Sequence, residues 1–262
     1  MIDDPPPPTW RLPEGVNSSL WEYARSTRMV EEDDDYFRDN PLHDFDAAAV
    51  DARFIRPGPA VDLGAGTGRH SLRLARRRFP VVAVDLSMPM LQSVKSRAEE
   101  AGLAVDCVRA NLCRLDALAS CSFDYALSMF STLGMIRGAV ARRKALAEAA
   151  RVLKPGGRLA LHAHNFWLNL RDAQGRQWLA LQLAKLLARR PDAGDRRMTY
   201  RRIPGMEVHL YRWGELRRDL HAAGFQIDEV VPIDAIRSRP IAAPRLAHPV
   251  RAGGWMVFAT KP

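Results

Sequence analysis

Residues 60–70 read Ala-Val-Asp-Leu-Gly-Ala-Gly-Thr-Gly-Arg-His, and residues 80–87 read Pro-Val-Val-Ala-Val-Asp-Leu-Ser. Each segment holds a short apolar run that ends in an acid, and the first run leads into a group of glycines. The apolar residues of the segment 69–78 suit a helix that packs on a sheet. The order of strand, glycine loop, helix and strand predicts the first half of a nucleotide-binding α/β fold.

Three glycines, Gly64, Gly66 and Gly68, suit a loop at the carboxyl end of a parallel strand. Such a loop must turn sharply, let a ligand approach its backbone and allow the next helix to pack close to the sheet. The dinucleotide fingerprint is Gly-x-Gly-x-x-Gly, and Arg69 stands where that fingerprint has its third glycine. The spacing therefore does not favour an NAD-dependent oxidoreductase.

Two acids accompany the glycines. Asp85 ends the second predicted strand, where a carboxylate can accept both hydroxyls of a ribose. Asp62 lies inside the first strand, and an unpaired buried carboxylate is costly. We therefore expect Asp62 to bind either loop amides or a cationic group of a ligand.

Val61–Gly68 and Asp85 resemble the first two motifs of class I S-adenosylmethionine-dependent methyltransferases. Later landmarks of that family follow in the same order, namely Arg109-Ala-Asn-Leu112, Phe123-Asp-Tyr-Ala-Leu-Ser-Met129 and Arg151-Val-Leu-Lys-Pro-Gly-Gly-Arg158. The resemblance covers residues 55–165 densely. It implies a Rossmann-like α/β fold, with a seven-stranded, mostly parallel sheet whose last strand is antiparallel, helices on both faces and a helical cap.

The same resemblance implies that S-adenosyl-L-methionine is the cofactor. The residues that it assigns to cofactor binding are Asp62, Gly64, Gly66, Gly68, Asp85, Leu86, Asn111, Leu112 and Met129. Asn111 stands where relatives commonly carry an acid that contacts the adenine amino group. Its amide oxygen can accept the same hydrogen bond, whereas its NH2 group could instead donate one.

The chain divides into four predicted parts. These are an N-terminal arm with lid helices (1–40), the S-adenosylmethionine-binding core (41–165), a substrate-cap insertion (166–207) and the completion of the core sheet (208–262). In the lid, Trp21, Tyr23, Arg25 and Tyr36 are candidates to cover the donor, or the aromatic residues pack the helix on the core. The acidic run Glu31–Asp35 is typical of a solvated face.

The cap is expected to consist mainly of a helix. Apolar residues at helical spacing predict an amphipathic helix over Trp167–Ala188, and a polar, basic segment, Arg189–Arg202, follows it. Met206–Tyr211 is expected to form a short strand of the cap.

Methyl transfer from a sulfonium needs mainly an aligned nucleophile and the exclusion of water. A base is required only if the nucleophile arrives protonated. The catalytic candidates are His162 and His164, which alternation places on one face of the fifth strand, although they could simply hydrogen-bond loop carbonyls. His209, next to the cap, is a weaker candidate. No third ligand accompanies the histidine pair and the cysteines lack metal-like spacing, so we expect no metal.

The acceptor that we favour is a small molecule. The formal net charge of +9 and the Arg-rich segments 189–202 and 237–251 make RNA or tRNA the alternative acceptor. A non-catalytic module that binds the donor is a third interpretation. The chain has no apolar run that could span a bilayer and its start lacks the features of a signal peptide, so we expect a cytoplasmic protein with no membrane partner. The oligomeric state stays open.

Overall fold

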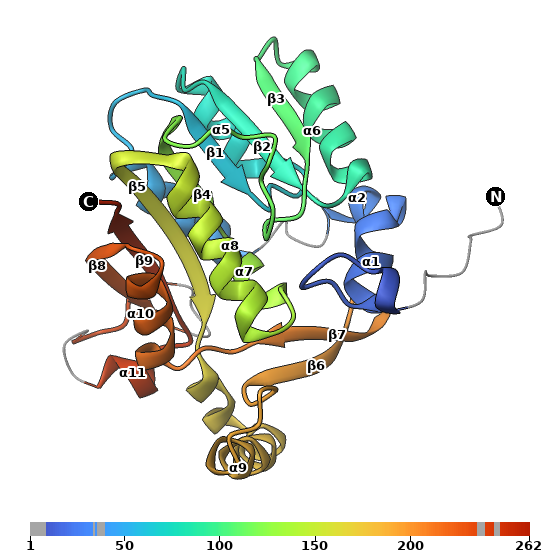
Figure 1. The fold of residues 1–262 in the computed structure, drawn as a ribbon, viewed down its shortest axis with the longest axis vertical. Coiled ribbons are helices and arrows are strands. Elements are labelled where there is room, and N and C mark those ends of the chain that lie inside the picture. Colours follow the sequence, from blue (N-terminus) through green and yellow to red (C-terminus); the bar gives the residue numbers. More distant parts are fainter. Residues whose placement is uncertain (1–8, 34, 36–39, 235–238, 244–246) are drawn as a thin grey trace, which may run out of the picture.

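The computed structural model describes residues 9–33, 35, 40–234, 239–243 and 247–262. Its main sheet has seven strands in the order β3-β2-β1-β4-β5-β9-β8 (Figure 1). The strands are β1 (Ala60–Leu63), β2 (Val81–Asp85), β3 (Val105–Arg109), β4 (Phe123–Ser128), β5 (Leu153–His164), β8 (Gln226–Ile233) and β9 (Gly254–Thr260). The strands from β3 to β5 pair in parallel, and β9 runs antiparallel to both of its neighbours. The predicted fold class is confirmed.

Helices cover both faces of this sheet (Figure 1). One face packs against α4 (Pro41–Asp51), α5 (Arg69–Arg76) and α6 (Met88–Glu100), and the other against α8 (Ala139–Val152) and α10 (Trp213–Ala222). Successive residues of β1 face opposite layers: Ala60 packs in the core beneath α4, and Val61 in the core beneath α8. Every residue of β1 is buried, as expected for a central parallel strand that is covered on both faces.

The strand order reverses between β1 and β4, because β1 leads outward to β2 and β3 whereas β4 leads outward to β5. In open α/β sheets ligands bind at such a switch point, outside the carboxyl ends of the strands. The glycine loop follows β1 there. Beyond β4, Phe130 and Ser131 both have positive φ, at 49° and 62°, and lead into the short helix α7 (Thr132–Met135). Two consecutive left-handed residues other than glycine are a strained arrangement of the kind that gathers at functional sites.

The cap differs from the predicted helical cap. The expected helix over Trp167–Ala188 is divided into a 3-10 helix, η2 (Phe166–Arg171), and α9 (Ala173–Leu187). The division falls at Asp172, whose side chain accepts a hydrogen bond from the Gly175 amide and so begins a new helix.

The rest of the cap is a two-stranded hairpin of β6 (Asp195–Tyr200) and β7 (Ile203–His209). The segment predicted only as polar and basic thus contains a strand. Its side chains pair across the hairpin, since Met198 lies opposite Met206 and Arg197 bonds to Glu207 at 2.7 Å. Its apolar residues, Met198 and Tyr200, alternate with the exposed Arg197 and Thr199, but this pattern is too short to predict a strand.

The hairpin reaches from α9 to the N-terminal helices α1 (Ser18–Arg25) and α2 (Thr27–Glu31) (Figure 1). A 3-10 helix, η1 (Thr9–Arg11), precedes α1, and a short helix, α11 (His248–Arg251), precedes β9. The core, the lid helices and the hairpin therefore enclose the space in front of the switch point.

Candidate functional site

A cavity of about 830 Å³ lies at the carboxyl ends of β1, β2 and β4. All of the predicted cofactor-binding residues except Gly68 line it, namely Asp62, Gly64, Gly66, Asp85, Leu86, Asn111, Leu112 and Met129. Gly68 instead begins α5 with a φ of 83°, and a Cβ atom there would lie 2.8 Å from the Val94 side chain on α6. It therefore serves close packing of the helices.

Gly64 and Gly66 serve different purposes in the loop. Gly64 has a φ of 81°, and a Cβ atom there would lie 2.3 Å from the Thr132 side chain, so the packing of the protein itself requires a glycine. Gly66 has a φ of 55°, and a Cβ atom there would meet nothing within 4 Å. The space in front of Gly66 can therefore accept a ligand close to the backbone.

Asp85 ties the glycine loop to the end of β2. Its Oδ2 accepts a hydrogen bond from the Gly66 amide at 2.9 Å, and its Oδ1 accepts one from the Ser87 amide at 2.8 Å. Burial raises the pKa of the Asp85 carboxyl, and the bonds from the Ser87 and Gly66 amides oppose that rise. Each oxygen keeps a second acceptor position, which a ribose hydroxyl can use.

Asp62 has a partner that was not among those expected. The Ser71 hydroxyl on α5 donates to Asp62 Oδ2 at 2.7 Å, and the Asp62 residue is only 2% exposed. Burial raises the pKa of Asp62, opposed by the nearby His70 and by the Ser71 hydroxyl. A buried carboxylate that faces a cavity and is bonded by Ser71 is suited to receive a cationic ligand group as well.

Asn111 is oriented by contacts on both sides of its amide. Its Nδ2 donates to the Glu14 carbonyl at 2.8 Å, and its Oδ1 accepts from the Cys113 amide at 3.0 Å. The sequence left open whether the amide of Asn111 accepts through its oxygen or donates through its NH2 group. In the structure the NH2 group donates to the N-terminal segment. The oxygen keeps one further acceptor position toward the cavity.

The lid is fastened over the cavity by Asp33. The Thr67 hydroxyl of the glycine loop donates to Asp33 Oδ2 at 2.7 Å, and Arg201 Nη1 at the hairpin tip donates to Asp33 Oδ1 at 2.8 Å. Arg201 also donates to the Met29 carbonyl at 2.7 Å. The expectation of a solvated acidic face over Glu31–Asp35 is therefore wrong for Asp33. Its partners are distant in sequence, and no local pattern indicates them.

The lid and the hairpin contribute aromatic rings to the cavity wall. Tyr23 on α1 and Tyr200 on β6 both line the cavity, and their ring centroids lie 6.1 Å apart. Of the other candidate lid residues, Trp21 and Arg25 are absent from the described wall, and Tyr36 lies outside the described residues. Sequence reasoning missed Tyr200, because it lies in the segment predicted only as polar and basic.

The predicted catalytic histidines lie behind the cavity wall. His162 is 2% exposed and its Nδ1 has no hydrogen-bond partner, and its ring centroid lies 4.9 Å from that of His164. Neither ring is among the described residues that line the cavity. Burial, with a smaller effect from His164, lowers the pKa of His162 to about 3, and burial lowers that of His164 to about 4. Both rings are therefore neutral near pH 7 and are weak bases.

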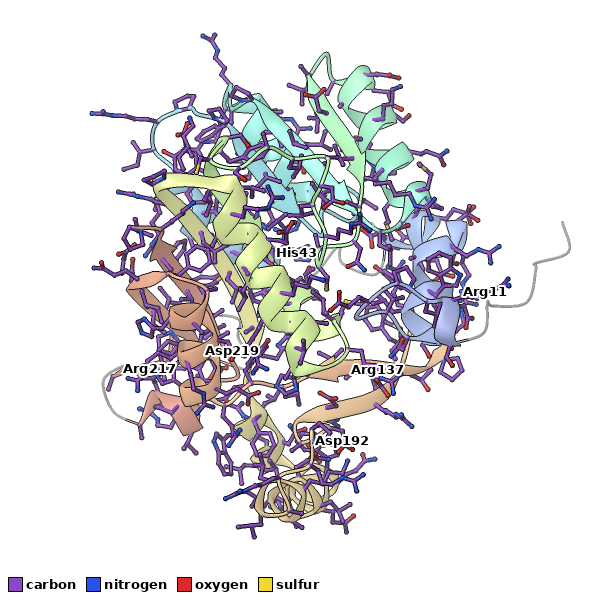
Figure 2. All side chains as sticks on the ribbon, in the orientation of Figure 1. Arg11, His43, Arg137, Asp192, Arg217 and Asp219 are labelled. Carbon is purple, nitrogen blue, oxygen red and sulfur yellow. The ribbon has the colours of Figure 1, made fainter. Side chains whose placement is uncertain are left out.

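Phe130 stands on the cavity wall in front of these histidines, with its ring centroid 6.5 Å from that of His162 and 6.4 Å from that of His164. His43 on α4 also lines the cavity, and its ring centroid lies 5.6 Å from that of Phe130. Figure 2 places His43 near the middle of the molecule. Burial and then the charge of Arg69 lower the pKa of His43 to about 4. Sequence reasoning missed His43, because nothing in α4 marks it as part of a site.

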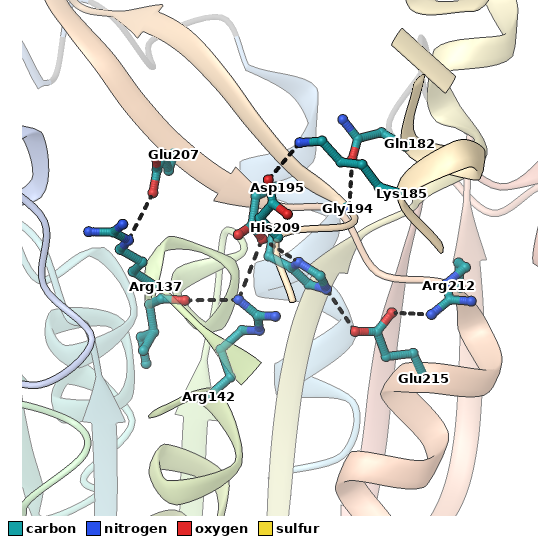
Figure 3. A network of polar contacts seen from close by, with 12 residues as sticks. Arg137, Arg142, Gln182, Lys185, Gly194, Asp195, Glu207, His209, Arg212 and Glu215 are labelled. Carbon is teal, nitrogen blue, oxygen red and sulfur yellow. Dashed lines mark hydrogen bonds and ion pairs between the residues drawn. The ribbon is translucent and has the colours of Figure 1, made fainter. Parts of the chain in front are cut away.

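His209 belongs to a polar network that joins the cap to the core (Figure 3). Its Nδ1 lies 2.7 Å from Asp195 on β6, and its Nε2 lies 2.9 Å from Glu215 on α10. Arg142 on α8 is 1% exposed and lies 3.6 Å from Asp195. Burial acts to raise the pKa of Glu215, but the bond with His209 lowers it overall. This weaker candidate is a link between cap and core, away from the cavity wall.

Among the described residues, no three His, Cys, Asp or Glu side chains gather in a way that could hold a metal ion. The cavity can instead hold an elongated organic ligand, since its volume is within the usual range for such sites.

Comparison with known families gives a match over residues 60–157, to a family described as "Methyltransferase domain". A demethylmenaquinone methyltransferase of Paenarthrobacter aurescens is 39% identical over 113 residues, which are 43% of this chain and 41% of that protein. A ubiquinone/menaquinone biosynthesis C-methyltransferase of Syntrophotalea carbinolica is 36% identical over 115 residues, 43% of this chain and 46% of that protein. The chain thus spans less than half of the length of these curated relatives.

Solved structures resemble the whole fold. An S-adenosylmethionine-dependent methyltransferase from Methanosarcina mazei matches with a TM-score of 0.63 and 21% identity, over 80% of this chain and 95% of that one. The 1,6-didemethyltoxoflavin-N1-methyltransferase of Burkholderia thailandensis, solved with 1,6-didemethyltoxoflavin and S-adenosylhomocysteine, matches with a TM-score of 0.59 and 20% identity, over 89% of this chain and 84% of that one. At these identities the likeness establishes the fold.

Proposed function

Because this chain belongs to the class I S-adenosylmethionine-dependent methyltransferases, we propose that it transfers a methyl group from S-adenosylmethionine to a small-molecule acceptor by in-line displacement. The observation that carries the proposal is a single cavity that joins the glycine loop and Asp85 to an aromatic wall from the lid and the hairpin. A donor and an acceptor can therefore share one space.

The residues at the switch point fit the donor. The backbone of Gly66 leaves room for close approach, Asp85 has acceptor positions for the ribose hydroxyls, and Asp62 is placed to receive the cationic amino group. When bound, S-adenosylmethionine supplies a methyl group on a positively charged sulfur. The protein has to hold it, align the acceptor and exclude water, which can account for much of the rate enhancement.

The far wall favours an acceptor with an apolar or aromatic surface. Tyr23 and Tyr200 line the cavity together with the apolar side chains of Leu20, Met135 and Ile136. The acceptors in the names of two similar proteins, demethylmenaquinone and 1,6-didemethyltoxoflavin, are small molecules of this kind, which supports the proposal.

A general base is not required if the acceptor reaches the cavity deprotonated. His162 and His164 remain the predicted catalytic residues, but their depressed pKa values and their position behind Phe130 weaken that assignment. We propose that His43, which lines the cavity, is the histidine that contacts the acceptor. In that case His43→Ala raises the acceptor KM, whereas His164→Ala leaves it unchanged.

Ion pairs within the protein weaken the RNA alternative, because they involve cationic side chains of segment 189–202. Arg190 pairs with Asp192, Arg197 with Glu207, and Arg202 with Glu32, so these guanidinium groups are partly neutralised within the protein. An RNA-binding surface would be expected to leave such groups for phosphates.

The first experiment is calorimetric titration of the protein with S-adenosylmethionine and S-adenosylhomocysteine, with NAD as the control ligand. We expect both sulfur compounds to bind, NAD not to bind, and Asp85→Ala to weaken binding at least tenfold. If neither sulfur compound binds, the proposal is wrong.

Methyl transfer is tested separately, by incorporation of labelled methyl groups into small-molecule and RNA fractions of a cell extract. Label in the small-molecule fraction supports the proposal. Label in the RNA fraction supports the alternative acceptor, and donor binding without any transfer supports the non-catalytic module.

A further inference from the structure

The outer side of α9 is an exposed apolar surface. Leu181, Leu183 and Leu187 are 66%, 41% and 88% exposed. Together with Ala180 and Ala184, which are exposed between them, the leucines form an arc on the helix that also holds the exposed Arg176 and Gln177. Figure 1 shows α9 at one end of the molecule, beyond the main sheet. Large apolar side chains gathered on one helix face mark an interaction site more often than single exposed ones do.

The inner side of α9 is already packed, so the outer leucines are not a core face turned outward. Leu179 is 3% exposed and packs with Phe166 and Leu210. Gln182 is buried and its side-chain oxygen accepts a hydrogen bond from the Gly194 amide at 3.0 Å. A Cβ atom on Gly175 would lie 2.2 Å from the Asn169 carbonyl oxygen. These contacts fix the rotation of α9 and leave the leucine arc without a partner in the part of the chain that the structure describes.

The surroundings of this arc are cationic. The sequence of α9 contains no acidic residue, and Arg176 and Lys185 lie on the exposed side or at its edge. Arg171 precedes the helix, and Arg189 and Arg190 follow it, all three exposed. Two acids oppose these charges: Asp172 caps the helix, and Asp192, labelled in Figure 2, bonds to Lys185 at 2.7 Å and lies 3.7 Å from Arg190. The surface remains apolar in its middle and positive at its borders.

We propose that the outer face of α9 docks on an anionic lipid surface. Exposed leucine side chains can enter the boundary between headgroups and acyl chains, while Arg and Lys side chains lie beside the anionic headgroups. Within the described residues no helix is both long and apolar enough to cross a bilayer, and α9 has 15 residues. The contact is therefore peripheral.

A second copy of the chain fits this surface less well. A two-fold interface brings the same patch of both copies together, so that Arg176 and Lys185 of one copy would lie near those of the other. Like charges at an interface oppose association, whereas an anionic surface attracts them. The formal net charge of +9 likewise opposes the association of two copies and favours an anionic surface. This inference departs from the sequence-based expectation of no membrane partner, and it does not depend on the methyl-transfer proposal.

The test is flotation of the full-length protein with vesicles of phosphatidylcholine alone and of phosphatidylcholine mixed with phosphatidylglycerol. We expect binding to the anionic vesicles, at least tenfold weaker binding to the neutral ones, and a decrease with added salt. Leu181→Gln combined with Leu187→Gln should reduce anionic binding at least tenfold. The matched control is Val140→Gln, which changes an equally exposed apolar residue (69%) on α8.

Circular dichroism and urea unfolding of the double variant establish that it is folded. Three results would overturn the inference: no binding to anionic vesicles, equal binding to neutral ones, or a folded double variant that binds like the wild type. A dimer in sedimentation experiments that the leucine substitutions dissociate would also overturn it, in favour of a second copy.

Discussion

At the scale of single residues, the glycine loop separates positions that the fold needs from positions that a ligand needs. Both glycines line the cavity. At Gly64 a side chain would clash with Thr132 and the backbone angle disfavours one, whereas at Gly66 only the backbone angle disfavours a side chain. Substitution by alanine should therefore have different effects at Gly64 and at Gly66.

Gly66→Ala should fold and lose donor affinity. The left-handed backbone costs an alanine about 1–2 kcal/mol, and no protein atom opposes the new methyl group. Gly66 lines the cavity in which we propose that the donor binds, so we expect S-adenosylhomocysteine to bind at least tenfold more weakly by calorimetry. Gly156→Ala is the matched control, because Gly156 also has a positive φ, at 77°, and open space around it, but lies outside the described cavity wall. Equal affinities of the two variants would contradict the assignment of Gly66.

At the scale of elements, the lid is held by the tip of the β6–β7 hairpin as much as by the core. Met29 on α2, Met90 on α6, and Ile203 and Met206 on β7 form one small buried cluster. Arg201 adds the ion pair to Asp33 in the same region, and its side chain is 1% exposed. Three elements that are distant in sequence therefore meet above the donor part of the cavity.

Arg201→Gln should loosen the lid. Removing one partner of a buried ion pair costs about 3–5 kcal/mol, and Asp33 would then hold only the Thr67 hydroxyl among the bonds described. We expect a lower free energy of unfolding, faster proteolysis within residues 17–33 and faster release of S-adenosylhomocysteine in stopped-flow experiments. Arg202→Gln is the control, since its side chain is 68% exposed and such a pair contributes about 0–1 kcal/mol. If both variants behave alike, Arg201 does not fasten the lid.

At the scale of the whole molecule, buried neutral histidines make stability depend on pH. His162 is buried without a bond to its Nδ1, and its pKa falls from 6.5 to about 3 in the folded protein. The unfolded chain binds a proton below its ordinary pKa of about 6.5, whereas the folded protein does not until the pH is near 3. Burial of neutral His162 therefore leaves the free energy of unfolding at its full value above pH 6.5. This stability is lost progressively as the pH falls from about 6.5 toward 3.

We expect the free energy of unfolding to decrease toward acid pH, with His162 contributing up to about 1.4 kcal/mol per pH unit. In urea titrations between about pH 6.5 and about pH 5, His162→Phe should show a shallower slope than the wild type. The raised pKa values of Asp62 and Asp85 act with the opposite sign, but they are common to both proteins and cancel in the comparison. Equal slopes would mean that His162 is protonated or exposed in the folded state.

Much of the core could be predicted from sequence, because its signals are local. The strand before Gly64 and the one before Asp85 follow directly from short apolar runs and the residues that end them. Ser87, which caps α6 by accepting from Met90, and Gly102, with its φ of 63°, mark the ends of that helix in the same way.

The lid contacts could not be predicted, because each partner is chosen by tertiary structure. In the sequence Asp33 is one acid of an acidic run. Only the folded chain brings Arg201 and Thr67 close enough to bond to it. His43 and Tyr200 likewise become site residues only when α4 and β6 meet the cavity. The cap was predicted as helical because a hairpin between polar strands carries little apolar alternation.

The position of β9 has a consequence for how the chain folds as it is made. β9 follows β5 and β8 in the sequence but lies between them in the sheet, and within the described parts of the chain β8 pairs with no other strand of that sheet. A ribosome therefore delivers β8 before the strand that attaches it to the rest of the molecule. Until β9 emerges, β5 and β8 each present unpaired backbone groups, and this interval is when a nascent chain most needs a chaperone.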